Sequence, residues 1–382
     1  MKYSLNLPSI SGLEKKYVLD VINSGWLSSN GTHTQIFQKK FSKLIDRKYS
    51  LAVQSGTAAL HLALKSLGCK TNDKVIIPNY TCVSNISSVA QCNAIPIIVE
   101  VEKETLGLDY DLVKRAIEKY KPKILQLVHV YGHPARDTVK IINLCKKKKV
   151  KVIEDASEAL GAKLNSKKIG SFGEISVFST RSEKMIGVGE GGMISTNNSK
   201  IFETISLIAS RNAPYRNKMD PYWKKYFHLG EGYNYLLPHL LGAVGRGQVE
   251  RFKSNMLPKK KGVGSFYKKI FKSKNYTLTQ KNLKNSLPVF WLNSLFFKYL
   301  NKKEVIKLAY SLEKKGIEVR SGFWPMSELK GFKSIYVKGE EKVSKNIFEK
   351  SLVLPSNVNL KYSDILKFKK EIDKNIPKRF ND

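Results

Sequence analysis

The sequence predicts an α/β protein with a large first domain, in which a mostly parallel sheet lies between helices, and a smaller α+β second domain. Its 382 residues exceed the roughly 100–200 residues of one domain. Forty-two per cent hydrophobic and 10% aromatic residues are enough to form a sizeable core. Short β-rich runs alternate with helical stretches through the first two thirds of the chain, which is typical of a parallel sheet.

Hydrophobic spacing assigns the elements of the first domain, taken as residues 1–250. The expected strands are residues 50–54, 74–78, 95–101, 123–130, 150–155, 174–180 and 192–196. The expected helices are residues 57–67, 84–92, 109–120, 137–149, 201–208 and 240–252. Residues 210–240 are rich in Tyr, Asn, Pro and Trp without a clean period, so we expect a long ordered loop, and such loops usually have a function.

The second domain is taken as residues 251–382, where the composition becomes richer in lysine. Its expected strands are residues 276–280 and 288–293, and its expected helices are residues 303–315 and 362–373. In sheets built from alternating strands and helices, ligands bind beyond the carboxyl ends of the strands. The chemistry is therefore expected in the first domain.

The net charge of +35 comes mainly from lysine, because only ten of the 67 basic residues are arginine. The lysines are scattered, with short runs at 146–149 and 259–261, so we expect a solvated surface and no nucleic-acid partner. A phosphate-bearing substrate or a weak attraction to a membrane surface remains open.

No apolar run approaches the roughly 20 residues of a membrane span, and no signal peptide is visible. The four cysteines form no CxxC pair. We therefore expect a cytoplasmic protein.

Three segments of the first domain carry candidate chemistry. Ser55–Ala59 is a strand-to-helix turn of small residues, which suits either a phosphate at a helix N-terminus or an ordinary helix cap. Asp155 ends an expected strand, where it would face a ligand or cap the next helix. Lys184 lies in a loop of small residues beside the sheet edge.

Two other patterns are set aside. The glycines of residues 187–192 match G-x-G-x-x-G, but this segment leads into an expected strand and not into a helix, so it is no dinucleotide fingerprint. His129 and His133 straddle a strand end, where a spacing of four does not bring two metal ligands together, and no metal is expected.

The three candidate segments together suit pyridoxal phosphate. A lysine amine can hold this cofactor as a Schiff base and move a proton, and an aspartate can keep its ring nitrogen protonated. A helix N-terminus can hold its phosphate.

In this order the segments resemble the DegT-type sugar-nucleotide aminotransferases, which have the aspartate aminotransferase-like fold of type I pyridoxal-phosphate enzymes. The resemblance runs from Pro8 to about Pro355 and rests on the following segments: SGWLSSNG (24–31), SGTAALHLAL (55–64), VHVYGHP (128–134), EDASEALGA (154–162), IGSFGEISVFS (169–179), KMIGVGEGGMISTN (184–197), GYNY (232–235) and GIEVRSGFWPM (316–326).

The resemblance implies roles for individual residues. Lys184 would bind the cofactor, Asp155 would pair with the pyridine nitrogen, and Glu158 would stand beside the ring hydroxyl. The residues expected to hold the phosphate are Gly56, Thr57, Ala58 and Ser179. Asn234 would reach the phosphate of the neighbouring subunit, which makes a homodimer obligatory. By family position alone, Trp26, Arg320 and Trp324 would contact the substrate.

The implied reaction moves the amino group of L-glutamate to a nucleotide-linked sugar, with the cofactor alternating between its pyridoxal and pyridoxamine forms. The segments at 154–162 and 323–326 are most similar to those of perosamine synthases, which aminate C4 of a GDP-linked 4-keto-6-deoxy sugar for surface polysaccharide and O-antigen synthesis. UDP- and dTDP-linked sugars, 3-keto sugars and nonulosonic-acid precursors remain open.

Three residues of this chain differ from those common in the family. Cys82 stands where an aromatic ring usually stacks on the cofactor, so stacking would be weaker or would come from Tyr80. Thr180 replaces a common Phe, and Leu236 replaces a common Arg. A C3 dehydratase and a non-catalytic relative are the alternatives, but dehydratases of this family carry histidine in place of Lys184.

Overall fold

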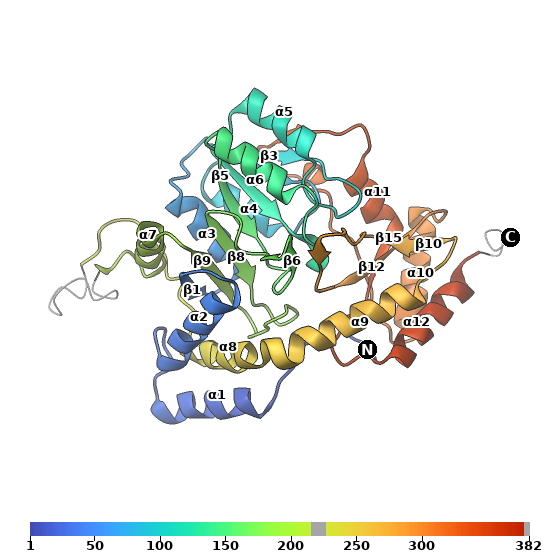
Figure 1. Cartoon of the computed structure of the whole chain (residues 1–382), viewed down its shortest axis with the longest axis horizontal. Helices are drawn as coiled ribbons and strands as arrows, with labels where there is room; N and C mark the ends of the chain where they lie inside the picture. Colours follow the sequence, from blue (N-terminus) through green and yellow to red (C-terminus); the bar gives the residue numbers. More distant parts are fainter. Residues whose placement is uncertain (215–226, 378–382) are drawn as a thin grey trace.

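The computed structural model describes residues 1–214 and 227–377, and its centre is a sheet of eight strands (Figure 1). In spatial order they are β1 (Tyr49–Val53), β9 (Gly192–Thr196), β8 (Ile175–Ser179), β5 (Lys151–Asp155), β4 (Ile124–Val128), β2 (Lys74–Pro78), β3 (Ile95–Val99) and β14 (Ile335–Val337). β9 runs antiparallel to β1 and β8, and the other neighbouring pairs are parallel. The expected mostly parallel sheet between helices is confirmed.

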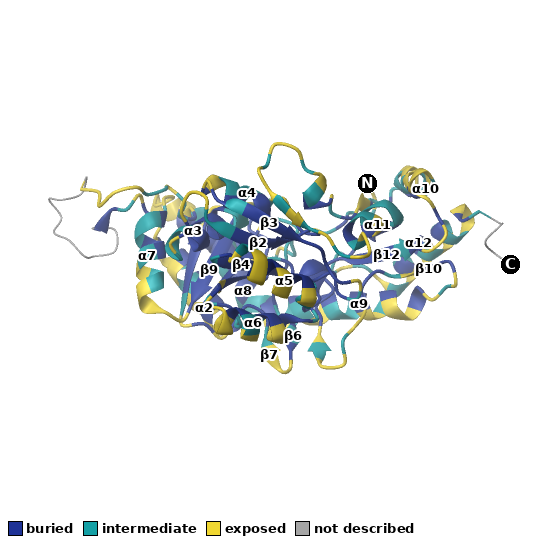
Figure 2. Cartoon of the chain, turned by 90° about the horizontal axis from the view of Figure 1, so that it is seen from above, coloured by how far each residue is buried: buried dark blue, intermediate teal, exposed yellow. Residues whose placement is uncertain are grey.

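Both faces of the sheet are buried because helices cover each of them, so side chains that alternate between the faces are all buried. Val75 and Ile77 of β2 pack into one hydrophobic cluster, and Ile76 between them packs into another. The helices of the first face are α3 (Gly56–Ser66), α4 (Ser84–Gln91) and α7 (Ser199–Ala209), and those of the second are α5 (Tyr110–Tyr120) and α6 (Thr138–Lys147). Figure 2 shows the buried strands between helices that are exposed on their outer sides.

The N-terminal part adds two helices for which the sequence analysis makes no prediction, α1 (Gly12–Ser24) and α2 (Thr32–Leu44). Their signals are local: Ser11 and Glu14 form a reciprocal capping box, and Gly25 ends α1 with a φ of 67°. Both helices pack on α8 (His239–Arg251). One π-helical turn joins α8 to α9 (Leu257–Ile270), and the two extend as a long rod along the molecule (Figure 1).

The C-terminal part has its own four-stranded antiparallel sheet. In spatial order its strands are β10 (Tyr276–Leu278), β12 (Asn293–Phe297), β15 (Ser351–Leu354) and β13 (Arg320–Ser321). The helices of this part are α10 (Lys302–Lys314), α11 (Val343–Lys350) and α12 (Tyr362–Asn375). A small third sheet contains β11 (Ser286–Leu287), β6 (Lys163–Leu164) and β7 (Lys167–Lys168).

Several contacts cross residue 250, where the sequence places the domain boundary. β14 returns to pair with β3 of the large sheet. At the other end of the chain, the N–H groups of Lys2 and Tyr3 donate to the carbonyl of Gly316, at 3.0 and 2.9 Å. The division at 250 stays a prediction, and it falls inside the α8–α9 rod.

One strand prediction is wrong. Residues 288–292 form no strand, and β12 begins only at Asn293. Their backbone contacts a turn of the first domain instead: the N–H of Val289 donates to Gly132 at 3.0 Å, and that of Leu292 to Tyr131 at 3.4 Å. Phe290 has a φ of 52°, which is incompatible with a strand. The segment therefore crosses toward the large sheet.

Of the loop expected at 210–240, residues 215–226 lie outside the described residues. No described helix combines the length and the apolar character that a membrane span requires.

Candidate active site

Asp155 lies at the carboxyl end of β5 and faces a cavity of about 290 Å³. Its carboxylate is held in place by two donors: Nδ2 of Asn85 lies 3.1 Å from Oδ2, and the N–H of Ser157 lies 3.1 Å from Oδ1. Asn85 is itself fixed, because Gln126 and Thr81 hydrogen-bond to its amide. The sequence analysis did not identify Asn85, since nothing in the α4 sequence distinguishes it from an ordinary buried residue.

The preceding residue, Glu154, points to the opposite side of the strand. It accepts hydrogen bonds from the N–H groups of Gly170 at 2.6 Å and Phe172 at 2.7 Å, and lies 3.2 Å from Nε2 of His129. Burial acts to raise the pKa of Glu154, but His129 and the backbone donors outweigh it, so the pKa lies below its usual value. Glu154 thus belongs to the interior and Asp155 to the cavity.

Lys184 reaches the same cavity from the loop after β8. Its Nζ lies 3.2 Å from Oε1 of Glu158, and its side chain is 11% exposed. The other oxygen of Glu158 accepts the N–H of Tyr131 at 2.8 Å. Burial raises the pKa of Glu158 above its ordinary value, although Lys184 and the Tyr131 N–H act in the opposite direction.

The N-terminus of α3 also lines the cavity. Ser55 caps the helix by accepting the N–H of Ala58 at 3.0 Å, so this N–H is already engaged. Gly56 lies so close to Ser179 that an added Cβ would be 3.1 Å from Cβ of Ser179. This close approach places the Ser179 hydroxyl beside a helix N-terminus, which is a favourable position for an anion.

The cavity brings together six of the predicted site residues, from segments far apart in the sequence. They are Gly56, Thr57, Asp155, Glu158, Ser179 and Lys184. The other residues that line it are Ser55, Leu60, Thr81, Cys82, Ser84, Val128, Ser157, Arg181, Glu183 and Glu190. Among the described residues no group of three or more His, Cys, Asp or Glu side chains could hold a metal ion.

The remaining predicted residues, which include Ala58, do not line this cavity. Trp26 is 57% exposed, and Asn234 is also exposed, with its backbone bridged to Ser210. Arg320 forms an ion pair with Glu318 at 3.1 Å. Trp324 is 45% exposed and packs edge-on against Phe348, with ring centroids 4.8 Å apart.

The structure also locates the departures from the family pattern. Cys82 lines the cavity and is exposed. Tyr80 is fully buried outside the lining, with its hydroxyl 3.2 Å from that of Tyr131, so the expectation that its ring could stack on a cofactor is wrong. Thr180 is buried, and Leu236 bridges Val53 at the end of β1.

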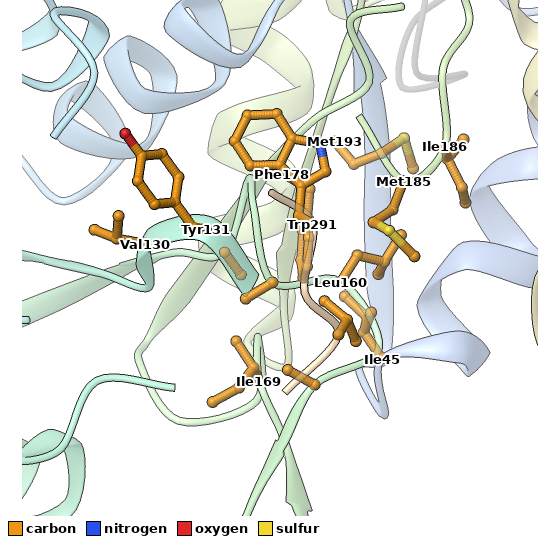
Figure 3. Close-up of a cluster of buried hydrophobic side chains, with 14 of the residues drawn as sticks. Ile45, Val130, Tyr131, Leu160, Ile169, Phe178, Met185, Ile186, Met193 and Trp291 are labelled. Carbon is orange, nitrogen blue, oxygen red and sulfur yellow. The ribbon is translucent and has the colours of Figure 1, made fainter. Parts of the chain in front are cut away.

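Trp291 contacts Lys184 as well, and no pattern in the sequence points to it. Its ring centroid lies 3.6 Å from Nζ of Lys184. The ring is buried among the side chains of one hydrophobic cluster, including Tyr131, Phe178 and Met185 (Figure 3). The composition of residues 288–292 predicts a strand, so only the observed course of the chain places this ring against Lys184.

Comparison with known sequences gives a consistent result. The profile of the DegT/DnrJ/EryC1/StrS aminotransferase family matches residues 8–372. The GDP-perosamine synthase of Vibrio cholerae is 32% identical over 349 residues, which cover 91% of this chain and 92% of that protein. The GDP-perosamine synthase of Escherichia coli O157:H7 is 31% identical over 367 residues, which cover 96% of both.

Solved structures share the fold. PseC of Helicobacter pylori, an aminotransferase involved in the biosynthesis of pseudoaminic acid, superposes with a TM-score of 0.87 at 22% identity, covering 98% of this chain and 99% of that one. A GDP-4-keto-6-deoxymannose-3-dehydratase superposes with a TM-score of 0.87, also at 22% identity, covering 97% and 100%. These likenesses confirm the aspartate aminotransferase-like fold.

Proposed function

Because this chain belongs to the DegT/DnrJ/EryC1/StrS aminotransferase family, we propose that it moves the amino group of L-glutamate to C4 of a GDP-linked 4-keto-6-deoxy sugar. The chain is a sugar aminotransferase that uses pyridoxal 5'-phosphate. The carbon, the nucleotide and the sugar are the proposal. They are supported by the two GDP-perosamine synthases that are about one third identical over nearly the whole chain.

The observation that carries the proposal is the meeting of Lys184, Asp155 and the α3 N-terminus in one cavity. This donor set fits pyridoxal 5'-phosphate, since it offers an amine, a carboxylate and an anion site. We propose that Gly56, Thr57 and Ser179 hold the phosphate, without the N–H of Ala58, which Ser55 already binds. When bound, the cofactor would supply an electron-withdrawing ring that stabilises negative charge at the carbon losing its proton.

The chain's own residues would then have separate roles in the reaction. Asp155, fixed by Asn85 and Ser157, would keep a negative charge opposite the ring nitrogen. Lys184 would take a proton from one carbon and return it to another, as a general base and acid. Glu158, which accepts a hydrogen bond from the Lys184 amine, would orient that amine. Val128 and Leu60 add apolar surface to the lining, which helps to exclude water.

Transamination is favoured over dehydration because the chain keeps Lys184. An amine at this position can both bind the cofactor and carry protons, whereas a histidine in its place could only carry protons. The similarity to the dehydratase structure, at 22% identity, concerns the fold alone.

We also propose a cytoplasmic homodimer in which Asn234 of each subunit reaches the active site of the other. Support comes from the exposure of Asn234 and of apolar side chains in the N-terminal part of the chain. These side chains are Leu19, Ile22, Trp26 and Leu27, each more than half exposed. Apolar residues exposed together typically mark an interface.

A mixing experiment tests this dimer. Lys184→Ala and Asn234→Ala subunits are each expected to be inactive, but a mixed dimer contains one site with both residues intact. Refolding the two together should restore about a quarter of the wild-type activity. No recovery, with mixed dimers demonstrated by tag exchange, would refute the shared site.

The reaction is tested with GDP-, UDP- and dTDP-linked 4-keto-6-deoxy sugars and L-glutamate, and the products are identified by mass spectrometry. We expect amination of the GDP-linked sugar, and a glutamate-dependent change in the absorbance of the bound cofactor. Lys184→Ala should abolish this change, whereas Lys281→Ala, at a side chain 71% exposed on the surface, should not. Conversion by Lys184→Ala at the wild-type rate would show that another amine does the chemistry.

A further inference from the structure

Trp291 makes two different contacts with the loop that carries Lys184. Its indole N–H donates to the carbonyl of Glu183 at 2.7 Å, which fixes the peptide immediately before Lys184. The face of its ring lies 3.6 Å from Nζ of Lys184. One side chain therefore holds both the backbone and the amine of the same lysine.

The chain is built to bring Trp291 to this place. Residues 288–292 leave the C-terminal part and run along the turn at Tyr131 and Gly132. Gly132 has a φ of 95°, and a Cβ there would lie 2.5 Å from the backbone nitrogen of Trp291, so only glycine permits this approach. Trp291 belongs to the same hydrophobic cluster as Phe178 and Met185 (Figure 3), and its ring centroid lies 6.4 Å from that of Tyr131.

A second donor reinforces the same carbonyl. Nδ2 of Asn6, in the N-terminal arm (residues 1–11, before α1), lies 2.5 Å from the carbonyl oxygen of Glu183. Two segments distant in the sequence thus converge on one peptide group. That peptide sets the start of the Lys184 side chain, while Glu158 and the Trp291 ring set its end.

We propose that Trp291 is a positioning residue that holds the Lys184 amine against Glu158 and aims it into the cavity. The inference rests on the proposed role of Lys184 as the reacting amine. A lysine stem has four flexible bonds, so an amine without such support would sample many positions. An aromatic face attracts an ammonium group by its quadrupole, and the attraction is stronger where water is excluded.

The first test needs no cofactor. The apoprotein is labelled with a trace of acetic anhydride, and mass spectrometry compares acetylation of Lys184 with that of Lys103, whose side chain is 69% exposed. Without the ring, the amine is freer to move and more accessible to the reagent. Trp291→Leu should therefore raise labelling of Lys184 relative to Lys103 by about threefold to tenfold. Trp291→Phe, which keeps a ring face, should raise it less.

Two controls separate positioning from unfolding. Lys260 is fully buried, so its acetylation reports loss of the fold and should stay negligible in every variant. Phe297→Leu truncates another fully buried ring, in the core of the C-terminal part, and should leave Lys184 labelling unchanged. Unchanged Lys184 labelling in Trp291→Leu would overturn the proposal.

Turnover provides the second readout. In Trp291→Leu, kcat should fall by about 100-fold while KM for L-glutamate stays within about twofold, because the amine is misplaced but the substrate contacts remain. A wild-type kcat in this variant would overturn the inference and leave the proposed function intact. If the wild-type protein itself showed no Lys184-dependent conversion, the proposed function would fail instead, and the inference would fail with it.

Discussion

Two lysines of the described part of the chain, Lys184 with a side chain 11% exposed and the fully buried Lys260, have very different surroundings. Lys184 lies at the cavity, where its amine is 3.2 Å from Glu158 and faces the ring of Trp291. Lys260 lies on α9 beneath the N-terminal arm, and its amine donates to Asn6, at 3.2 Å, and to the carbonyl of Ser356. No carboxylate among residues 1–214 and 227–377 forms an ion pair with Lys260.

The comparison shows that burial and an unusual pKa do not by themselves mark an active site. Burial lowers the pKa of Lys260 to about 7. Yet the atoms around its amine are neutral oxygens that only accept hydrogen bonds, and Lys260 does not line the cavity that holds Lys184. A reacting amine needs open space beside it for a ligand and a charged neighbour, such as a carboxylate. Lys184 has both, and Lys260 joins three segments of the fold.

The largest effect is expected at the cavity, from Asp155→Asn. Asparagine keeps the shape of the side chain but removes the negative charge that we place opposite the cofactor nitrogen. The rate of the L-glutamate half-reaction, followed by absorbance, should fall by about 100- to 1,000-fold. The midpoint of urea unfolding of the apoprotein should fall modestly, because the asparagine amide can accept only one of the two hydrogen bonds from Asn85 and Ser157.

Asp137→Asn provides the matched control away from the cavity. Asp137 is equally buried, and it pairs with Arg136 at 2.7 Å. Its substitution should lower stability and leave the half-reaction rate near that of the wild-type protein. An equal loss of rate in the two variants would mean that Asp155 acts through the fold and not through the cofactor.

Much of the cavity could be predicted from the sequence because its parts lie at strand ends and helix starts. Asp155 ends a strand that is buried on both faces, and the turn at Ser55 precedes a helix of regular spacing. In a parallel sheet the carboxyl ends of neighbouring strands meet at one edge, so local patterns suffice to bring these residues together.

The other side of the site depends on contacts that leave no local pattern. Phe290, with a φ of 52°, turns residues 288–292 out of the expected strand, and this turn delivers Trp291 to Lys184. Asn6 and Glu183 are 177 positions apart. Neither contact could be read from composition or periodicity, because each is set by how the two ends of the chain dock on the large sheet.

A smaller effect, on stability, is expected from Lys260→Met. The native amine has a pKa of about 7, and an unfolded lysine has one near 10.5. Between these values the unfolded state binds more protons than the native state, so the free energy of unfolding of the wild-type protein rises with pH from about 7 to 10.5. Methionine does not titrate. The difference in unfolding free energy, wild type minus variant, should therefore rise by about 2 kcal/mol between pH 7 and pH 9.

Urea unfolding at the two pH values measures this difference, with Lys103→Met at an exposed lysine as the control. The control should show no such pH-dependent change. A difference for Lys260 that stays constant with pH would mean that its amine is protonated in the native state throughout this range. Lys184 and Lys260 would then differ in their neighbours and not in their charge.

The smallest effect is expected from Gly56→Ala at the cavity, and Gly12→Ala in the N-terminal part is its matched control. Gly56 and Gly12 are each the first residue of a helix, α3 and α1. A Cβ on Gly56 would lie 3.1 Å from Cβ of Ser179, whereas a Cβ on Gly12 would meet nothing within 4 Å. Gly56→Ala should therefore push the helix N-terminus away from Ser179. Binding of pyridoxal phosphate should weaken by about threefold to tenfold, because the added methyl group makes a strained contact in a packed site. Gly12→Ala should leave the dissociation constant unchanged, and equal affinities in the two variants would remove α3 from the phosphate site.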